Sequence, residues 1–174
     1  MVSGRIKKLF LYAKCMKNLL LSHHPSCQKF EKHTINIKKY KFCIGCYIGY
    51  PTAILGIIFL WIFKIPALLG RDTLLIWALI LISAFILSPL KLTAIKFIKI
   101  IQKMLIGLGS SFLFWFIWSL PNAFLINLFY FILVFGFLIT LLNLYHALGM
   151  QQICKNCKYF SKWGTCPGFQ NIIE

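Results

Sequence analysis

Long uncharged hydrophobic stretches alternate with short basic segments along this chain. Three stretches carry no Asp, Glu, Lys or Arg, namely residues 42–63, 73–90 and 104–154. A helix needs about 20 apolar residues to cross the hydrocarbon core of a membrane, so the first two stretches predict one helix each. The third is long enough for two, and Ser119-Leu120-Pro121-Asn122 predicts a turn in its middle. The pattern therefore predicts four helices, at about 50–69, 73–90, 104–120 and 123–147.

The basic residues give these helices an orientation. Ten Lys and Arg precede residue 49, four lie between the second and third predicted helices, and three follow the fourth. Only Lys64 and Arg71 fall on the other side, and Lys64 is expected to snorkel from the end of the first helix. The positive-inside rule then predicts a multi-pass protein of the cell membrane with both termini in the cytosol. The loop with Lys96, Lys99 and Lys103 is expected to lie on the inner leaflet.

Composition narrows the class of protein. Hydrophobic residues make up 60% and aromatic residues 17% of the 174 residues, which is typical of a membrane protein. The net charge of +16 suits nucleic acid or anionic lipid, and the membrane content favours the anionic inner leaflet. Only three residues are acidic, Glu31, Asp72 and Glu174, so sites built on paired carboxylates are disfavoured. A transporter is disfavoured as well, because the predicted helices contain no buried charges.

Four regions follow from these patterns. Residues 1–21 predict a basic amphipathic helix on the membrane surface, although a core-facing helix of a small cytosolic lobe fits equally well. Residues 22–48 form a Cys/His segment, residues 49–148 the four-helix transmembrane region, and residues 149–174 a cytosolic Cys-rich tail. Within the transmembrane region, the small residues of 107–111 predict close helix packing, and Asn127 and Asn143 are expected to bond neighbouring helices.

The first cysteine cluster has the spacing of a zinc site. It reads His24-x2-Cys27-x15-Cys43-x2-Cys46. Pairs of ligands two residues apart, on turns, supply the tetrahedral N and S set that zinc prefers. Between the pairs, 34–37 and 40–42 predict two short strands, which would make a zinc-ribbon-like hairpin. His23 and His33 remain rival ligands.

The second cluster reads Cys154-x2-Cys157-x8-Cys166 and supplies three ligands. His33, His23 or Cys15 could complete it as a second site. Alternatively, Cys43 and Cys46 share one site with Cys154 and Cys157, which would tie the two ends of the chain together. In a reducing cytosol, paired thiols favour metal over disulfides. A redox dithiol and an iron–sulfur cluster are the alternatives to zinc.

One segment also resembles a known family. His24 followed by Cys43-Ile44-Gly45-Cys46-Tyr47-Ile48-Gly49 is similar to a motif of small, uncharacterised prokaryotic multispan membrane proteins. Those proteins carry a His-bearing segment and then C-x-R-C-T-G-x-Y-x-G before several helices. Here Gly45 stands in place of the Arg, and no Thr-Gly follows Cys46. The resemblance implies a metal-binding, multispan membrane protein and no particular activity.

The sequence therefore favours a non-enzymatic protein, a structural or adaptor protein with four transmembrane helices and a zinc-stabilised cytosolic lobe. Its partners would be membrane lipids and a protein that docks at the lobe. The first rival is a membrane redox protein with an iron–sulfur cluster or dithiol. The second is a zinc-dependent, lipid-acting enzyme, for which Glu31 is the acidic residue nearest the first cluster.

Overall fold

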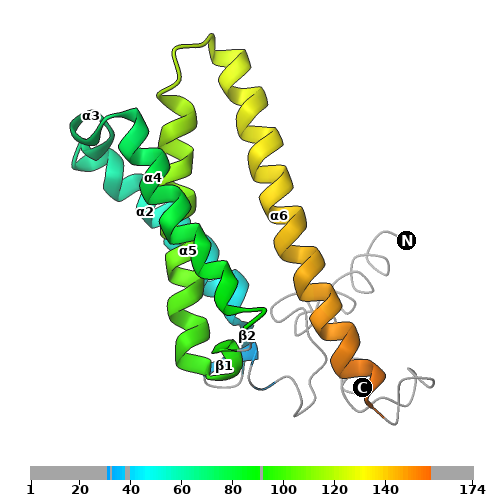
Figure 1. Cartoon of the computed structure of the whole chain (residues 1–174). Helices are drawn as coiled ribbons and strands as arrows, with labels where there is room; N and C mark the ends of the chain where they lie inside the picture. The colour runs from blue at the N-terminus through cyan, green and yellow to red at the C-terminus, as the bar shows by residue number, and fades with distance from the viewer. Residues whose placement is uncertain (1–30, 32, 38–39, 91, 158–174) are drawn as a thin grey trace, which may run out of the picture. The chain divides into compact units, whose positions relative to one another are not determined.

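The computed structural model describes residues 31, 33–37, 40–90 and 92–157 (Figure 1). The chain divides into two compact units. One consists of residues 44–147 and is helical. The other combines residues 1–43 with 148–174. The predicted surface helix at 1–21 lies outside the described residues.

Helices account for nearly all of the described chain. In order they are η2 Gly45–Gly49, α2 Tyr50–Ile62, α3 Ile65–Leu69, α4 Arg71–Ile82, η3 Ser83–Leu87, η4 Leu92–Ala94, α5 Lys96–Trp118 and α6 Phe124–Lys155. Among the described residues, three helical segments are long and apolar enough to cross a membrane, namely Gly45–Ile62, Lys96–Trp118 and Phe124–Lys155. The predicted helical membrane fold is confirmed at this level.

The first predicted helix, 50–69, is wrong in its second half. The helix α2 ends at Ile62, Lys64 adopts a left-handed backbone (φ 52°), and α3 begins at Ile65. Pro66 lies in the first turn of α3. A continuous helix would need an N–H at Pro66 to pair with the carbonyl of Ile62, and proline has none.

The other three helices also differ in their limits. The second ends as an α-helix at Ile82 and tightens into the 3-10 helix η3. The third begins at Lys96 rather than 104, so Lys96, Lys99 and Lys103 form the first turns of α5 and not a separate loop. The fourth reaches Lys155 rather than 147. For the third helix the reason is that lysine stems can lie along apolar surface, so Lys96, Lys99 and Lys103 are accommodated in a helix where charge alone predicts a loop.

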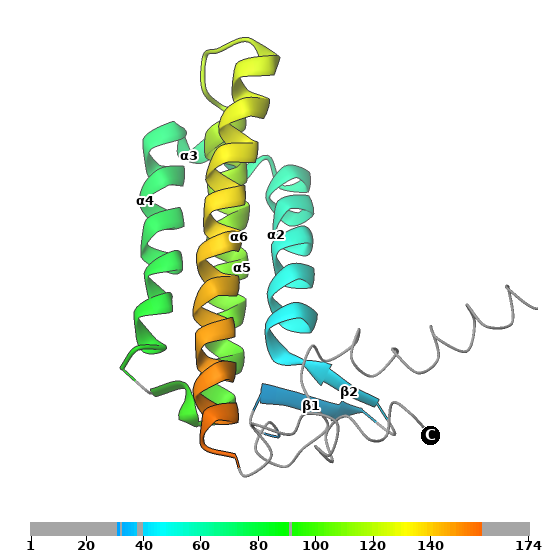
Figure 2. The same cartoon turned by 90° about the vertical axis from the view of Figure 1, so that its right-hand side faces the viewer.

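The centre of the helical unit is α5, which packs against both α2 and α4 (Figure 2). Small residues allow this close approach. A Cβ added at Gly107 would lie 2.6 Å from the carbonyl oxygen of Gly49 in η2, and one at Gly109 would lie 3.0 Å from the backbone nitrogen of Ile82. The predicted close packing at 107–111 is confirmed, because no larger side chain fits at these glycines.

Two hydrogen bonds join α5 to α2. Ser111 Oγ donates to the carbonyl oxygen of Ala53 at 2.9 Å, and Trp115 Nε1 donates to that of Ile57 at 3.1 Å. The two donors are four residues apart on α5, and the two acceptors are four residues apart on α2. The two bonds therefore lie one turn apart on the facing surfaces of the helices. In lipid, such bonds fix the register of neighbouring helices.

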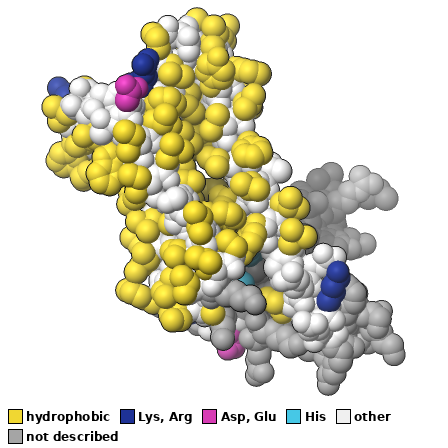
Figure 3. All heavy atoms as spheres, in the orientation of Figure 1, with side chains coloured by type: hydrophobic (Ala, Val, Ile, Leu, Met, Phe, Trp, Pro, Cys, Tyr) yellow, Lys and Arg dark blue, Asp and Glu magenta, His cyan; other side chains and the backbone are white. Residues whose placement is uncertain are grey.

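The last helix packs on a small apolar core. Ala78, Leu113 and Ile117 are buried, and four α6 side chains lie against them: Phe131, Val134, Phe135 and Leu138. Away from this face, large hydrophobic side chains are exposed over the helical surface, as Figure 3 shows. Such a surface suits contact with lipid.

Asn127 stabilises the turn between α5 and α6. Its Nδ2 donates to the carbonyl oxygen of Leu120 at 3.1 Å, and its Oδ1 accepts from Asn122 Nδ2 at 3.3 Å. The expected bond between helices is therefore a bond from α6 to the turn that precedes it. No comparable bond of Asn143 appears among the described residues.

The other unit contains a β-hairpin. Strands β1 Thr34–Ile37 and β2 Tyr40–Cys43 pair antiparallel, with Thr34 opposite Cys43. The predicted hairpin is confirmed, and β2 extends one residue further than expected, to Cys43.

Candidate metal centre

The thiols of the first C-x2-C pair lie where extended chain becomes helical. Cys43 is the last residue of β2 and is only 4% exposed. Ile44 already has helical backbone angles, and Cys46, which is partly exposed, belongs to the π-helix η2. Gly45 stands between them, as the first residue of η2. Single-turn π-helices are frequent at functional sites.

The second pair lies at the end of α6. The N–H of Cys157 donates to the carbonyl oxygen of Cys154 at 2.9 Å, which closes a turn over the two intervening residues. Both side chains are partly exposed. A turn of this kind is where a C-x2-C pair offers two ligands to one metal ion.

Two histidines of the described chain accompany these pairs. His33 precedes β1 directly and is half-buried. His146 is half-buried on α6, eight residues before Cys154, which is about two helical turns. Within the part of the chain that the structure describes, no three His, Cys, Asp or Glu side chains gather into a metal-binding group.

The remaining predicted ligands lie outside the described residues. These are His24, Cys27 and Cys166, together with the rival ligands His23 and Cys15. The ligand set of His24, Cys27, Cys43, Cys46, Cys154, Cys157 and Cys166 therefore stays a prediction. Glu31, the acidic residue required by the lipid-acting enzyme, is exposed.

A buried polar cluster lies at the carboxyl-terminal end of the second span, where α5 contacts η3. The sequence did not predict it. Gln102 of α5 is fully buried, and its Nε2 donates to the carbonyl oxygens of Ala84 (3.0 Å) and Phe85 (3.3 Å) and to Ser88 Oγ (2.8 Å). The Oε1 atom of Gln102 is also buried and accepts no hydrogen bond from the described residues. Sequence reasoning missed the cluster because Gln102 adjoins Lys103, where the charge pattern predicts a loop.

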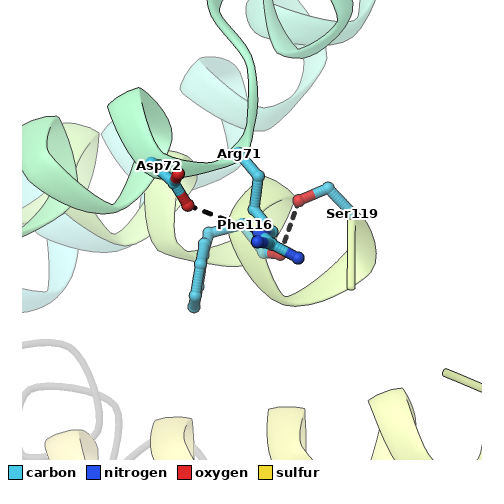
Figure 4. Close-up of polar contacts among 4 residues, drawn as sticks. All are labelled: Arg71, Asp72, Phe116 and Ser119. Atoms are coloured by element: carbon cyan, nitrogen blue, oxygen red, sulfur yellow. Dashed lines mark hydrogen bonds and ion pairs between the residues drawn. The ribbon is translucent and has the colours of Figure 1, made fainter. Parts of the chain in front are cut away.

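An ion pair lies at the end of the helical unit that is far from Gln102. Arg71 Nε lies 3.4 Å from Asp72 Oδ1, and Ser119 Oγ donates to the carbonyl oxygen of Phe116 at 2.8 Å. The Arg71 side chain extends toward this carboxyl-terminal turn of α5 (Figure 4). A cation near the negative end of a helix dipole is favourable, although an exposed ion pair contributes little stability by itself.

These features define a class of protein: a helical membrane protein with cysteine pairs at the ends of its elements. Comparison with protein families, characterised proteins and solved structures found no significant match for this chain.

Proposed function

We propose that the chain is a four-span membrane protein whose cytosolic lobe is held together by zinc and serves as a structural or adaptor element. The observation that carries this is the placement of the two C-x2-C pairs. Each stands at the end of a regular element: Cys43 ends β2 and Cys46 lies in the η2 helix that follows, and Cys154 lies in the last turn of α6 with Cys157 just beyond it. The grouping of residues 1–43 with 148–174 in one compact unit supports a lobe built from both ends of the chain.

A fourth span is needed for both ends to share a compartment. The 12 residues of α4 and the 5 of η3 give about 18 Å and about 10 Å of length, close to the hydrocarbon thickness of about 30 Å. Their contacts run along α5 from Leu113, which packs with Ala78, to Gln102, which bonds Ala84. A segment that follows a membrane-spanning helix over this length is expected to cross with it.

Zinc gives the lobe a source of stability that its short hairpin lacks. A hairpin of two four-residue strands is marginal in water. Binding of zinc to small peptides contributes about 10–16 kcal/mol. The resemblance of residues 43–49 to a motif of uncharacterised prokaryotic multispan membrane proteins also implies a metal-binding segment. The partners proposed for the lobe are the anionic leaflet, through the basic segments of the chain, and a docked protein.

Two other functions remain as rivals. A membrane redox protein would use the same cysteines for an iron–sulfur cluster or dithiol. A zinc-dependent, lipid-acting enzyme needs an acidic base beside the metal, and the exposure of Glu31 disfavours it.

Elemental analysis of the purified full chain tests the proposal. We expect stoichiometric zinc in the wild type and a clear loss in Cys43→Ser/Cys46→Ser. The variant Cys154→Ser/Cys157→Ser separates the two arrangements: it loses all zinc if the pairs share one site, and only part of it if there are two. Equal zinc in all three proteins contradicts the assignment, and iron with acid-labile sulfide favours the redox protein.

A further inference from the structure

An apolar cavity of about 240 Å³ lies among the end of α4, η3, α5 and α6, within the helical unit. Its walls are the side chains of Ile82, Ser83, Phe85, Ile86, Ile106, Ser110, Leu138, Leu141 and Leu142. The two serine hydroxyls do not need a polar ligand as acceptor, because Ser83 Oγ donates to the carbonyl oxygen of Ile80 and Ser110 Oγ to that of Ile106. The cavity therefore suits a hydrocarbon group and not a polar one.

Its position favours a lipid chain over water. Apolar cavities stay dry, and one of about 150 Å³ already accepts benzene. The walls here belong to helices that pack within the membrane region, where acyl chains are the solvent. The cavity opens to the helix surface, where its lining residues Ile86 and Leu141 are exposed, so an acyl chain of the surrounding bilayer can enter it.

The wall formed by α5 continues into two lysines. Lys99, Lys103, Ile106 and Ser110 are spaced by four, three and four residues, so they follow one face of the helix. From Ser110 to Lys99 is 11 residues, about 17 Å. This is close to one leaflet of hydrocarbon, about 15 Å. The Cα–Cβ bonds of a helix tilt toward its N-terminus, so both lysines lean away from the cavity, toward the headgroup layer.

We propose that the cavity and the Lys99–Lys103 face form a binding site for an anionic glycerophospholipid of the inner leaflet. One acyl chain lies in the cavity, and the phosphate and anionic headgroup lie against the two lysines. The leaflet named here rests on the four-span topology proposed above, whereas the site itself rests only on the helical unit. A failed zinc analysis would therefore leave the lipid site standing, and a failed lipid test would leave the zinc lobe standing.

Lipid retention by the full chain tests the site. The protein is placed in nanodiscs of equimolar phosphatidylglycerol and phosphatidylcholine with identical acyl chains, released into mild detergent, and its retained lipids are counted by native mass spectrometry. We expect phosphatidylglycerol to be preferred, by about fivefold for each lysine near the headgroup. The variant Lys99→Gln/Lys103→Gln should lose this preference, and Lys64→Gln/Arg71→Gln, the same change in charge on the opposite side of the proposed four-span topology, should keep it.

A second pair of variants tests the acyl chain. Leu141 lines the cavity, and Leu144, three residues further along α6, does not. We expect Leu141→Trp to fill the cavity and lower retention of both lipids several-fold, while Leu144→Trp retains them as the wild type does. Thermal unfolding of each variant shows that the fold is kept. Equal retention of the two lipids by the wild type overturns the headgroup assignment, and equal retention by the two tryptophan variants overturns the cavity as the acyl site.

Discussion

Gly56 of α2 and Ser111 of α5 lie in direct contact, although 55 positions separate them along the sequence. A Cβ added at Gly56 would overlap the hydroxyl of Ser111 and lie 3.0 Å from its Cβ. The same hydroxyl donates to Ala53, one turn earlier on α2. The glycine permits the approach, and the serine uses it to bond the neighbouring backbone.

Gly56→Ala should therefore destabilise the helical unit. We expect a loss of about 1–3 kcal/mol from overpacking, since Ser111 is too short to move aside. Gly136→Ala is the matched control, because a Cβ at Gly136 meets nothing within 4 Å. Unfolding in mixed micelles measures both. Equal stability of the two variants would show that α2 and α5 do not pack at this distance.

Removal of a donor between α2 and α5 should have a smaller effect. Trp115→Phe keeps an aromatic side chain but loses the indole N–H and with it the 3.1 Å bond to the carbonyl oxygen of Ile57. Bonds of this kind between membrane helices contribute about 0.6 kcal/mol on average. Ser110→Ala serves as the control, because its hydroxyl bonds only within α5. A loss for Ser110→Ala as large as that for Trp115→Phe would argue against a bond between helices.

We expect Gln102→Leu to lower the free energy of unfolding more than Trp115→Phe or Ser110→Ala does. It leaves the carbonyl oxygens of Ala84 and Phe85 without the amide donor that reaches them from α5. The Phe85 carbonyl keeps a bond from the N–H of Ser88, so the expected loss is that of the amide's own hydrogen bonds, about 0.5–1.5 kcal/mol each. Gln151→Leu makes the same substitution at an exposed position of α6. The midpoint of thermal unfolding should fall for Gln102→Leu alone, and a fall of the same size for Gln151→Leu would contradict this role.

The four-span topology predicts where fused reporters are active. Alkaline phosphatase, which folds outside the cytosol, should be active when fused after Gly70 or Asn122. Green fluorescent protein, which needs the cytosol, should fluoresce when fused after Leu90 or Cys157. An inactive phosphatase at Gly70 would mean that α2 and α4 do not both cross the membrane. Fluorescence at Leu90 but not at Cys157 would place the chain's two ends on opposite sides and remove the basis for a shared lobe.

Removal of metal should act on the lobe and spare the helices. If zinc holds the hairpin, a chelator should increase proteolysis near Cys43 and leave the helical circular dichroism signal nearly unchanged, because the helical unit packs by itself. Added zinc should restore protection in the wild type and not in Cys43→Ser/Cys46→Ser. Protection that is indifferent to the chelator would argue against structural zinc.

Much of this architecture could be predicted from local sequence. Absence of charge marked the membrane helices, alternation over Thr34–Ile37 marked a strand, and the small residues around Gly107 and Gly109 marked a packing face. Each of these patterns depends on residues close in sequence or on contact with solvent, so it can be recognised from the sequence alone. The spacing of Cys43 and Cys46 predicts a tight turn, whereas the structure has the end of β2 at Cys43 and the helix η2 at Cys46.

Other features depend on contacts between distant segments. The first turns of α5 contact the 3-10 end of the second span, where Gln102 bonds Ala84 and Phe85. No local sequence pattern at Gln102 predicts these bonds. The cavity is likewise formed by residues from α4, η3, α5 and α6, segments that meet only in the folded protein. By itself, the sequence determined that hydrophobic helices would seek lipid and that basic flanks would resist crossing, because transfer from water is a property of each side chain. Only the tertiary structure decided which helix lies at the centre, how closely backbones approach and where polar groups pair, because these depend on shape complementarity between surfaces that meet only after folding.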